Sequence, residues 1–156
     1  MEISVENLQK KVALNHRQIL KIARAILRHE GVKKAVLTIV FVTSQRIKAL
    51  NKEFLGRNYA TDVLAFDAND FRPAPRGIKQ ETHALAGDII ISIDAAIQNS
   101  IAYKTELPEE ITLYVIHGIL HLLGFDDHRF NDRNRMRKKE QELLSYLGKK
   151  VKGVLA

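Results

Sequence analysis

The sequence predicts a single α+β domain in which about five helices pack a small mixed four-stranded sheet. Apolar, β-branched runs alternate along the chain with segments whose apolar residues recur every three or four positions. The length of 156 residues, with 46% hydrophobic and 28% charged residues, suits one domain with its own core. The sequence shows no internal repeat, low-complexity segment or glycine-rich phosphate loop.

Four segments are expected to form the strands. Residues 2–6 alternate weakly and suit an edge strand, whereas residues 35–42 are almost continuously apolar and suit a central one. Residues 61–66 and 87–93 have the composition of two further strands. The stretch between them, residues 67–85, holds two of the three prolines and is expected to be a surface loop.

The first two helices have recognisable ends. Asn15 is a suitable N-cap for a helix that runs to about residue 30, and Gly31 is a suitable stop signal. Its apolar residues share one face, and its outer face is basic. Thr43 and Ser44 can cap a second, shorter helix over residues 45–54.

Two further helices follow the last strand. Ser92 or Asp94 can cap a helix that extends to about residue 103. The final helix is expected over about 131–147, with Asn131 or Asp132 as its cap and a glycine as its stop.

The remaining helix, over about 107–123, is predicted to be buried and to bind a metal ion. Apolar residues fall on all of its faces, and it contains His117 and His121. Positions i and i+4 of a helix lie one turn apart on the same side, so both imidazoles can reach one ion. Gly124 can turn the chain out of the helix and bring His128 back towards it.

Three neutral imidazoles plus a water molecule are typical of a catalytic metal site. With no cysteine in the chain, His, Asp or Glu must supply the ligands, and imidazole ligands favour Zn²⁺ or a similar divalent transition metal. The zinc-protease motif H-E-x-x-H carries its general base after the first histidine, where this chain has Gly118. Peptide hydrolysis is therefore disfavoured. Of Asp126 and Asp127, one is expected to shape the turn, and the other could orient ligands or accept a proton.

The charge distribution indicates a polyanionic partner. The formal net charge is +7, and residues 129–156 hold nine Lys or Arg against three acids. A basic segment beside a metal site favours nucleic acid; the alternative is a solvated helix face followed by a loose basic tail from about residue 148. No apolar window suits a membrane span, and the first residues lack the features of a signal peptide, so a cytoplasmic protein without a membrane partner is expected.

The histidine stretch also resembles a known signature. Residues 117–128, HGILHLLGFDDH, are similar to the H-G-x-L-H-L-x-G-Y-D-H pattern of the YbeY endoribonucleases, a family of rRNA maturation factors. Leu50-Asn51, Gly56 and residues 61–66 are similar to that family's LN…RGKDxxTDVLSF block, and residues 86–91 are similar to its LGDIxI strand. The three blocks occur in the family's order over residues 50–128.

The resemblance implies a metal-dependent endoribonuclease that cleaves single-stranded RNA. It implies roles in small-subunit rRNA 3′-end maturation and ribosome quality control, with RNA and the small ribosomal subunit or its proteins as partners and no DNA substrate. It also implies that zinc is held by His117, His121 and His128. The alternative is a non-catalytic, metal-containing factor in ribosome assembly.

The chain departs from the family pattern at two places. Six residues separate His121 from His128 where the family has five, so either the turn bulges and His128 still binds the ion, or Asp127 competes for it. His128 is favoured as the third ligand, because the extra residue falls in a loop. The family's functional arginine is replaced by Leu55, and the nearest basic residue is Arg57. Arg57, as a contact to phosphate or transition state, and Asp127 are accordingly the predicted catalytic residues.

Overall fold

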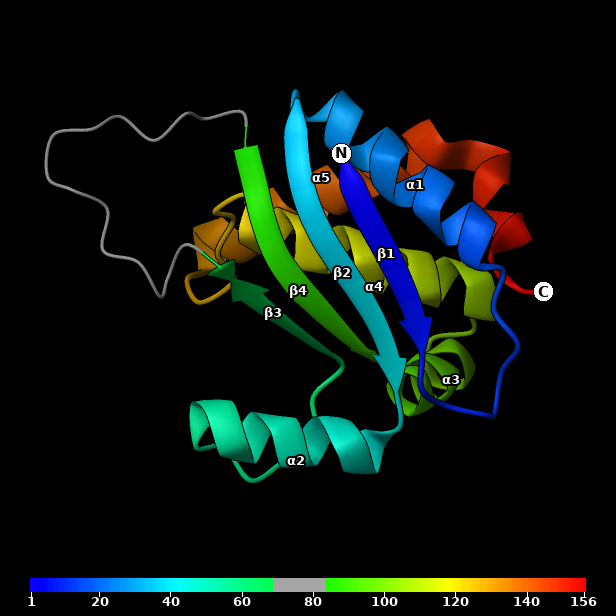
Figure 1. The fold of residues 1–156 in the computed structure, drawn as a ribbon, viewed down its shortest axis with the longest axis vertical. Helices are drawn as coiled ribbons and strands as arrows, with labels where there is room; N and C mark the ends of the chain where they lie inside the picture. Colours follow the sequence, from blue (N-terminus) through cyan, green and yellow to red (C-terminus); the bar gives the residue numbers. More distant parts are fainter. Residues whose placement is uncertain (69–83) are drawn as a thin grey trace, which may run out of the picture.

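Strands and helices alternate along the chain around one mixed sheet (Figure 1). The computed structural model describes residues 1–68 and 84–156. The strands are β1 (Glu2–Asn7), β2 (Lys34–Val42), β3 (Val63–Asp67) and β4 (Ala84–Ser92). The α-helices in the described part are α1 (His16–His29), α2 (Ser44–Leu55), α3 (Ile93–Ala102), α4 (Leu107–Leu122) and α5 (Phe130–Leu147), and a 3₁₀ segment, η2 (Gly148–Val154), follows.

The sheet has the order β1-β2-β4-β3. The β1–β2 and β2–β4 pairs are parallel, and β3 runs antiparallel to β4. The predicted α+β class with a mixed four-stranded sheet is thereby confirmed, including the edge position of β1 and the central position of β2. Because β3 reaches Asp67 and β4 begins at Ala84, the predicted 67–85 loop is wrong at both ends; its residues 69–83 lie outside the described part of the chain.

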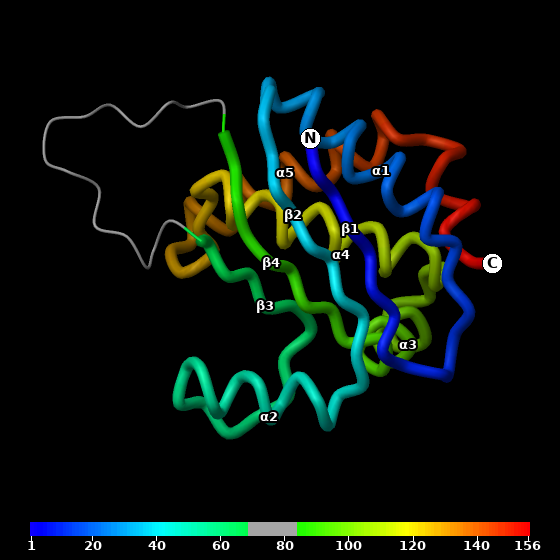
Figure 2. The backbone as a smooth tube through the Cα atoms, viewed as in Figure 1, coloured from blue at the N-terminus to red at the C-terminus, as the bar shows by residue number. Residues whose placement is uncertain are grey.

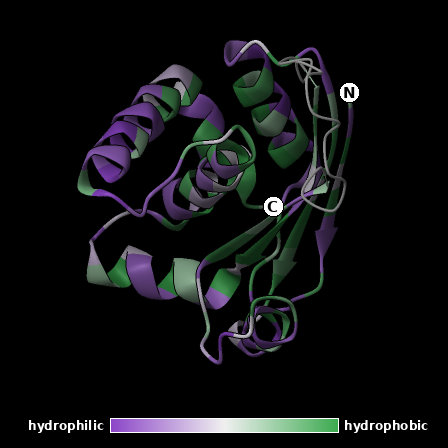
Figure 3. Ribbon diagram, turned by 90° about the vertical axis from the view of Figure 1, so that its left-hand side faces the viewer, coloured by the Kyte–Doolittle hydropathy of each residue, from purple (hydrophilic) through white to green (hydrophobic). Residues whose placement is uncertain are grey.

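The helices form two unequal layers. The main core joins one face of the sheet to α1, α3, α4 and α5, and these helices lie together behind the strands (Figures 1 and 2). A smaller cluster joins α2, through Ile47, to Val40 and Phe66 on the opposite face. The strands are mostly hydrophobic, and hydrophilic residues gather on the outward sides of the helices (Figure 3).

Side chains cap three helices as the sequence predicts. Asn15, Thr43 and Ser92 each accept a hydrogen bond from a backbone N–H three residues later. The predicted cap of the last helix is wrong, because Asn131 and Asp132 both lie inside the first turn of α5. The preceding Arg129 takes the cap position without a side-chain hydrogen bond.

The C-terminal segment is folded, which corrects the alternative of a loose tail from about residue 148. Val154 is buried, and its carbonyl accepts the Asn15 N–H at 2.8 Å. The Ala156 N–H donates to Ala13 O at 3.1 Å, so the end of the chain pairs with the residues just before α1. Across the described ranges, 1–68 and 84–156, no helix is both long and apolar enough to cross a membrane.

Candidate metal centre

Helix α4 lies unusually close to the sheet at Gly118. A Cβ placed on this glycine would lie 2.5 Å from Cγ2 of Ile89 on β4, well inside van der Waals contact. A glycine at this position therefore lets the helix approach the strand. The approach carries His117 and His121 to the edge of the sheet beside β3, and it leaves no room for the glutamate of a zinc-protease helix.

The two histidines converge on one point. Their Nε2 atoms are 3.0 Å apart, and their rings meet at 79°. Behind them, Oε1 of the buried Glu140 lies 2.6 Å from Nδ1 of His117. This contact assigns the proton of neutral His117 to Nδ1, so that the Nε2 lone pair faces its partner histidine. A carboxylate behind a histidine is the usual support of a metal-binding imidazole.

The surroundings separate the pKa values of the two histidines. Burial acts to lower the pKa of His117, but the hydrogen bond and charge of Glu140, with help from Asp62 and Asp127, outweigh burial and raise it. Burial and the neighbouring charge of His117 lower the pKa of His121. The lowered pKa favours the neutral form of His121, which can bind a cation without losing a proton, whereas the raised pKa of His117 makes a proton a stronger competitor for a cation there.

The turn after α4 places the next polar residues. Gly124 has a φ of 97°, which turns the chain away from the helix axis. Asp126 Oδ1 accepts the N–H groups of Asp127 and His128 at 2.7 and 3.2 Å, so Asp126 shapes the turn. Desolvation acts to raise the pKa of Asp126, but these two bonds, with the charges of His128 and His121, outweigh it and hold the pKa below its ordinary value.

Asp127, rather than His128, lies beside the histidine pair. Its Oδ2 is 3.7 Å from Nε2 of His117 and 3.6 Å from Nε2 of His121. The His128 side chain is 77% exposed, and its Nε2 faces Asp126 Oδ1 at 3.5 Å. His117, His121 and Asp127 thus form one potential ligand group, while His128 belongs to a neighbouring group with Asp126 and Asp127.

The first group fits a small divalent ion. Zinc–ligand bonds of about 2.0–2.2 Å in tetrahedral geometry separate the ligand atoms by about 3.3–3.6 Å. The three separations in the structure, 3.0, 3.6 and 3.7 Å, differ from these values by a few tenths of an ångström. Two imidazoles and a carboxylate suit Zn²⁺ and related transition metals.

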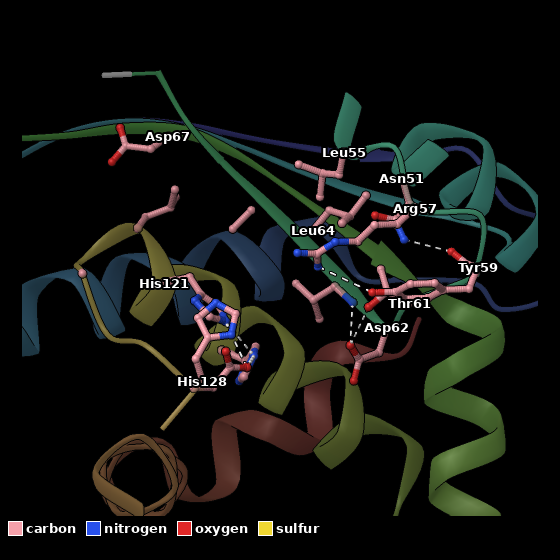
Figure 4. A pocket seen from close by; sticks show the side chains of 16 residues that line it. Asn51, Leu55, Arg57, Tyr59, Thr61, Asp62, Leu64, Asp67, His121 and His128 are labelled. Carbon is pink, nitrogen blue, oxygen red and sulfur yellow. Dashed lines mark hydrogen bonds and ion pairs between the residues drawn. The ribbon is translucent and has the colours of Figure 1, made fainter. Parts of the chain in front are cut away.

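The ligand group lines a cleft of about 500 Å³. Arg57 and Tyr59, from the loop between α2 and β3, lie on the wall opposite His121 and His128 (Figure 4). Gly56 has a left-handed conformation that directs the loop, and the Arg57 side chain contacts the Tyr59 hydroxyl at 3.5 Å. The structure thus brings Arg57 into the cleft that holds the histidines. Leu55 lines the same cleft.

Glu140 is a site residue that sequence reasoning missed. It occupies a position in the buried stripe of α5 that Met136, Leu143 and Leu147 otherwise fill. A charged residue in an apolar helical stripe is a signal that could have found it, because a buried carboxylate needs a partner. Asp62, the residue just before β3, is another acid that sequence reasoning missed, and it lines the cleft with Asp67 and Asp127.

The fold and the cleft together define a small α+β protein with an open, catalytic-type candidate metal centre. The sequence matches the model of the family described as Endoribonuclease YbeY over residues 4–148. The chain therefore belongs to the endoribonuclease YbeY family.

Individual relatives agree with this assignment. An endoribonuclease YbeY of Pelotomaculum thermopropionicum is 35% identical over 94% of this chain and 97% of its own. That of Syntrophus aciditrophicus is 32% identical over 94% of this chain and 90% of its own. The solution structure of TM1509 from Thermotoga maritima shares the fold, with a TM-score of 0.57, 21% identity and coverage of 92% and 90% of the two chains.

Proposed function

We propose that this protein is a metal-dependent endoribonuclease that hydrolyses phosphodiester bonds in single-stranded RNA. One observation carries the proposal: a Glu140-supported histidine pair shares a cleft with an arginine, in a family described as endoribonucleases. The physiological substrate in this proposal is the 3′ end of small-subunit rRNA, processed in the cytoplasm with the small subunit or its proteins as partner.

The proposed metal centre uses His117 and His121 as two of its ligands. A bound Zn²⁺ ion, or a related divalent metal, would supply a Lewis acid and lower the pKa of a coordinated water. Glu140 holds the His117 ring in orientation through the contact at Nδ1. The neutral state of His121 favours binding without loss of a proton.

Two assignments of the third ligand compete. The resemblance to the family signature supports His128, which would have to turn inward from its exposed position. The distances of 3.6 and 3.7 Å support Asp127, which already lies beside both imidazoles. In the first assignment Asp127 remains available to orient water or accept a proton; in the second it is a ligand.

The proposed role of Arg57 is to bind the scissile phosphate. A guanidinium can donate two hydrogen bonds to one phosphate and stabilise the charge that develops in the transition state. Arg57 lines the cleft from the wall opposite the histidines (Figure 4). Leu55, in the position of the family arginine, contributes only apolar surface to the same cleft.

The direct test is cleavage of purified single-stranded RNA by the zinc-loaded protein. A His117→Ala/His121→Ala variant should lose cleavage, and Arg57→Gln should retain metal binding but slow cleavage about a hundredfold or more. His16, an exposed histidine at the start of α1, supplies the matched control His16→Ala. Cleavage at the normal rate by the folded double variant would contradict the proposal.

The third ligand is tested separately by zinc affinity. His128→Ala should weaken zinc binding if His128 is a ligand, whereas Asp127→Asn should do so if Asp127 is one. Loss of one protein ligand lowers affinity far more than loss of a water contact, so the larger effect identifies the ligand. Zinc affinity equal to that of wild type in both variants would contradict both assignments.

A non-catalytic role in ribosome assembly is the alternative, and the leucine at position 55 is the observation behind it. In that case the metal would be structural. Equal rescue of ribosome assembly by wild type and by a folded, metal-free variant would favour this role. The names of the relatives favour the enzyme instead.

A further inference from the structure

We propose that the outer face of α1, together with the first turn of η2, is a second RNA-binding surface. It lies apart from the metal cleft and binds the sugar–phosphate backbone of the RNA. We call it the α1 basic face and define it by Arg17, Lys21, Arg24, Arg28 and Lys150. The inference rests on the proposed function only in taking RNA as the partner.

The cations of α1 are arranged in one row. Arg17, Lys21, Arg24 and Arg28 recur at intervals of four, three and four residues, so they lie on successive turns of one face. At 1.5 Å per residue the row is about 16 Å long. No acid occurs anywhere in His16–His29. Like charges at this spacing each cost an isolated helix about 0.2–0.5 kcal/mol, so helix stability does not explain the row.

These cations also lack carboxylate partners within residues 1–68 and 84–156. None of the five forms an ion pair there, whereas Lys139 pairs with Glu30 and Glu142. Those two acids lie just beyond the C-terminal end of α1 and limit the α1 basic face on that side. Its charge is therefore available to an external anion.

A groove runs along the row. It has a volume of about 400 Å³ and is lined by Gln18, Lys21, Arg24, Ala25, Arg28 and Lys150. The Gln18 side chain donates to Lys150 O at 2.7 Å, which fixes the start of η2 against the helix. The folded C-terminal segment thus contributes a further cation to a defined surface.

The groove and the metal cleft are separate. They share no lining residue. Helix α1 packs beside β1 at one edge of the sheet, and β3 lies at the other edge (Figures 1 and 2). Residues of β3, among them Val63 and Leu64, line the metal cleft. An RNA bound on the α1 basic face therefore leaves the cleft open to another segment of the same molecule.

The chemistry of the groove favours an RNA backbone over a membrane or a protein. A helix that binds a membrane surface must insert its apolar face, but the apolar face of α1 is consumed by the core, with Ile22 1% and Ile26 0% exposed. Stable protein interfaces have aromatic or aliphatic anchors at their centre. The lining of this groove offers only Ala25 as an apolar side chain.

The test compares two triple variants that remove the same charge. Lys21→Gln/Arg24→Gln/Arg28→Gln removes three of the five positive charges of the α1 basic face, and Lys10→Gln/Arg46→Gln/Lys48→Gln removes three exposed positive charges outside it. Glutamine is a good helix former, and Lys10, the only changed residue outside a helix, is exposed, so both variants should fold; circular dichroism and thermal melting check this. Binding of a structured small-subunit rRNA fragment is measured by fluorescence anisotropy over a range of salt concentrations, and cleavage of a short single-stranded oligonucleotide is measured in parallel.

We expect the first variant to bind the rRNA fragment at least tenfold more weakly. The slope of log affinity against log salt should fall by about 2–3, because each lost phosphate contact removes about 0.7–0.9 from it. Cleavage of the short oligonucleotide should remain unchanged, and the second variant should stay within about threefold of wild type in both assays.

Equal losses in the two variants, or none in the first, would overturn the proposal. The proposal would also be overturned if wild type bound vesicles that contain phosphatidylserine and the first variant lost this vesicle binding but still bound the rRNA fragment as wild type does. Failure of the proposed function is distinguishable, because wild type would then bind the rRNA fragment without cleaving either RNA.

Discussion

Replacing Glu140 tests whether the histidine pair is built to hold a metal ion. Glu140→Gln keeps the shape of the side chain and an oxygen that can accept from Nδ1 of His117, but it removes the charge. Glu140→Leu removes both. Loss of the group behind a metal-binding histidine lowers metal affinity by about 10–100-fold, or about 1.4–2.7 kcal/mol.

The geometry places the two variants at opposite ends of this range. The contact is short, at 2.6 Å, and the Glu140 side chain is only 12% exposed, so water cannot readily replace it. We therefore expect about a tenfold loss of zinc affinity for Glu140→Gln and a loss near a hundredfold for Glu140→Leu.

The assay is competition for zinc against a chromogenic chelator at neutral pH. Glu142→Gln, an acid on the same helix whose ion pairs are with His29 and Lys139, is the matched control and should bind zinc as wild type does. Identical zinc affinities in wild type and both Glu140 variants would refute the assignment of this carboxylate as the support of the metal centre.

Three further predictions concern stability. Zinc at about a hundred times its dissociation constant should stabilise the protein by about 2.7 kcal/mol, which is a rise of about 5–10 °C in Tm, and EDTA should abolish the rise; an unchanged Tm would contradict a metal site. Gly118→Ala should lower the free energy of unfolding by about 1 kcal/mol, measured by urea unfolding, because overpacking against Ile89 costs about 1–3 kcal/mol and the better helix propensity of alanine returns about 1 kcal/mol. An increase in the free energy of unfolding would show that α4 can move away from β4. Bonds from Lys11 and the Ser44 N–H hold the pKa of Asp94 below 3.8, so this stabilisation is complete above that pH and is lost as the pH falls through the lower folded value. Asp94→Asn should therefore lower the free energy of unfolding by about 2 kcal/mol at neutral pH, and this free energy should fall less steeply in acid than it does in wild type. A variant profile parallel to that of wild type at all pH values would refute the reasoning.

Local features of the fold could be predicted from the sequence because local interactions determine them. The helix caps at Asn15 and Thr43 and the apolar character of β2 are properties of neighbouring residues. The order of the strands depends on pairing between distant segments, and no local pattern specifies it. The folded C-terminal segment escaped prediction for the same reason, since its lysines are exposed while Val154 is buried against another part of the chain.

In the candidate site, too, the features set by local structure could be predicted, and those set by the tertiary structure could not. His117 and His121 could be predicted to converge because the helix period alone places them on one side. The placement of Asp127 beside them depends on how a six-residue turn folds, which the spacing did not determine. Glu140 comes from a helix that follows the turn, so only the tertiary structure brings it to His117.

The pairing of residues 13–15 with residues 154–156 has a consequence for synthesis. Asn15 and Ala13, just before α1, bond to Val154 and Ala156, which are made much later than they are. Strands β1 and β2 are made early, yet the segment between them cannot complete its hydrogen bonds until η2 and the two residues that follow it have been made. The domain should therefore acquire its final stability only once η2 has folded, and a nascent chain arrested before Val154 should remain sensitive to proteases near Ala13.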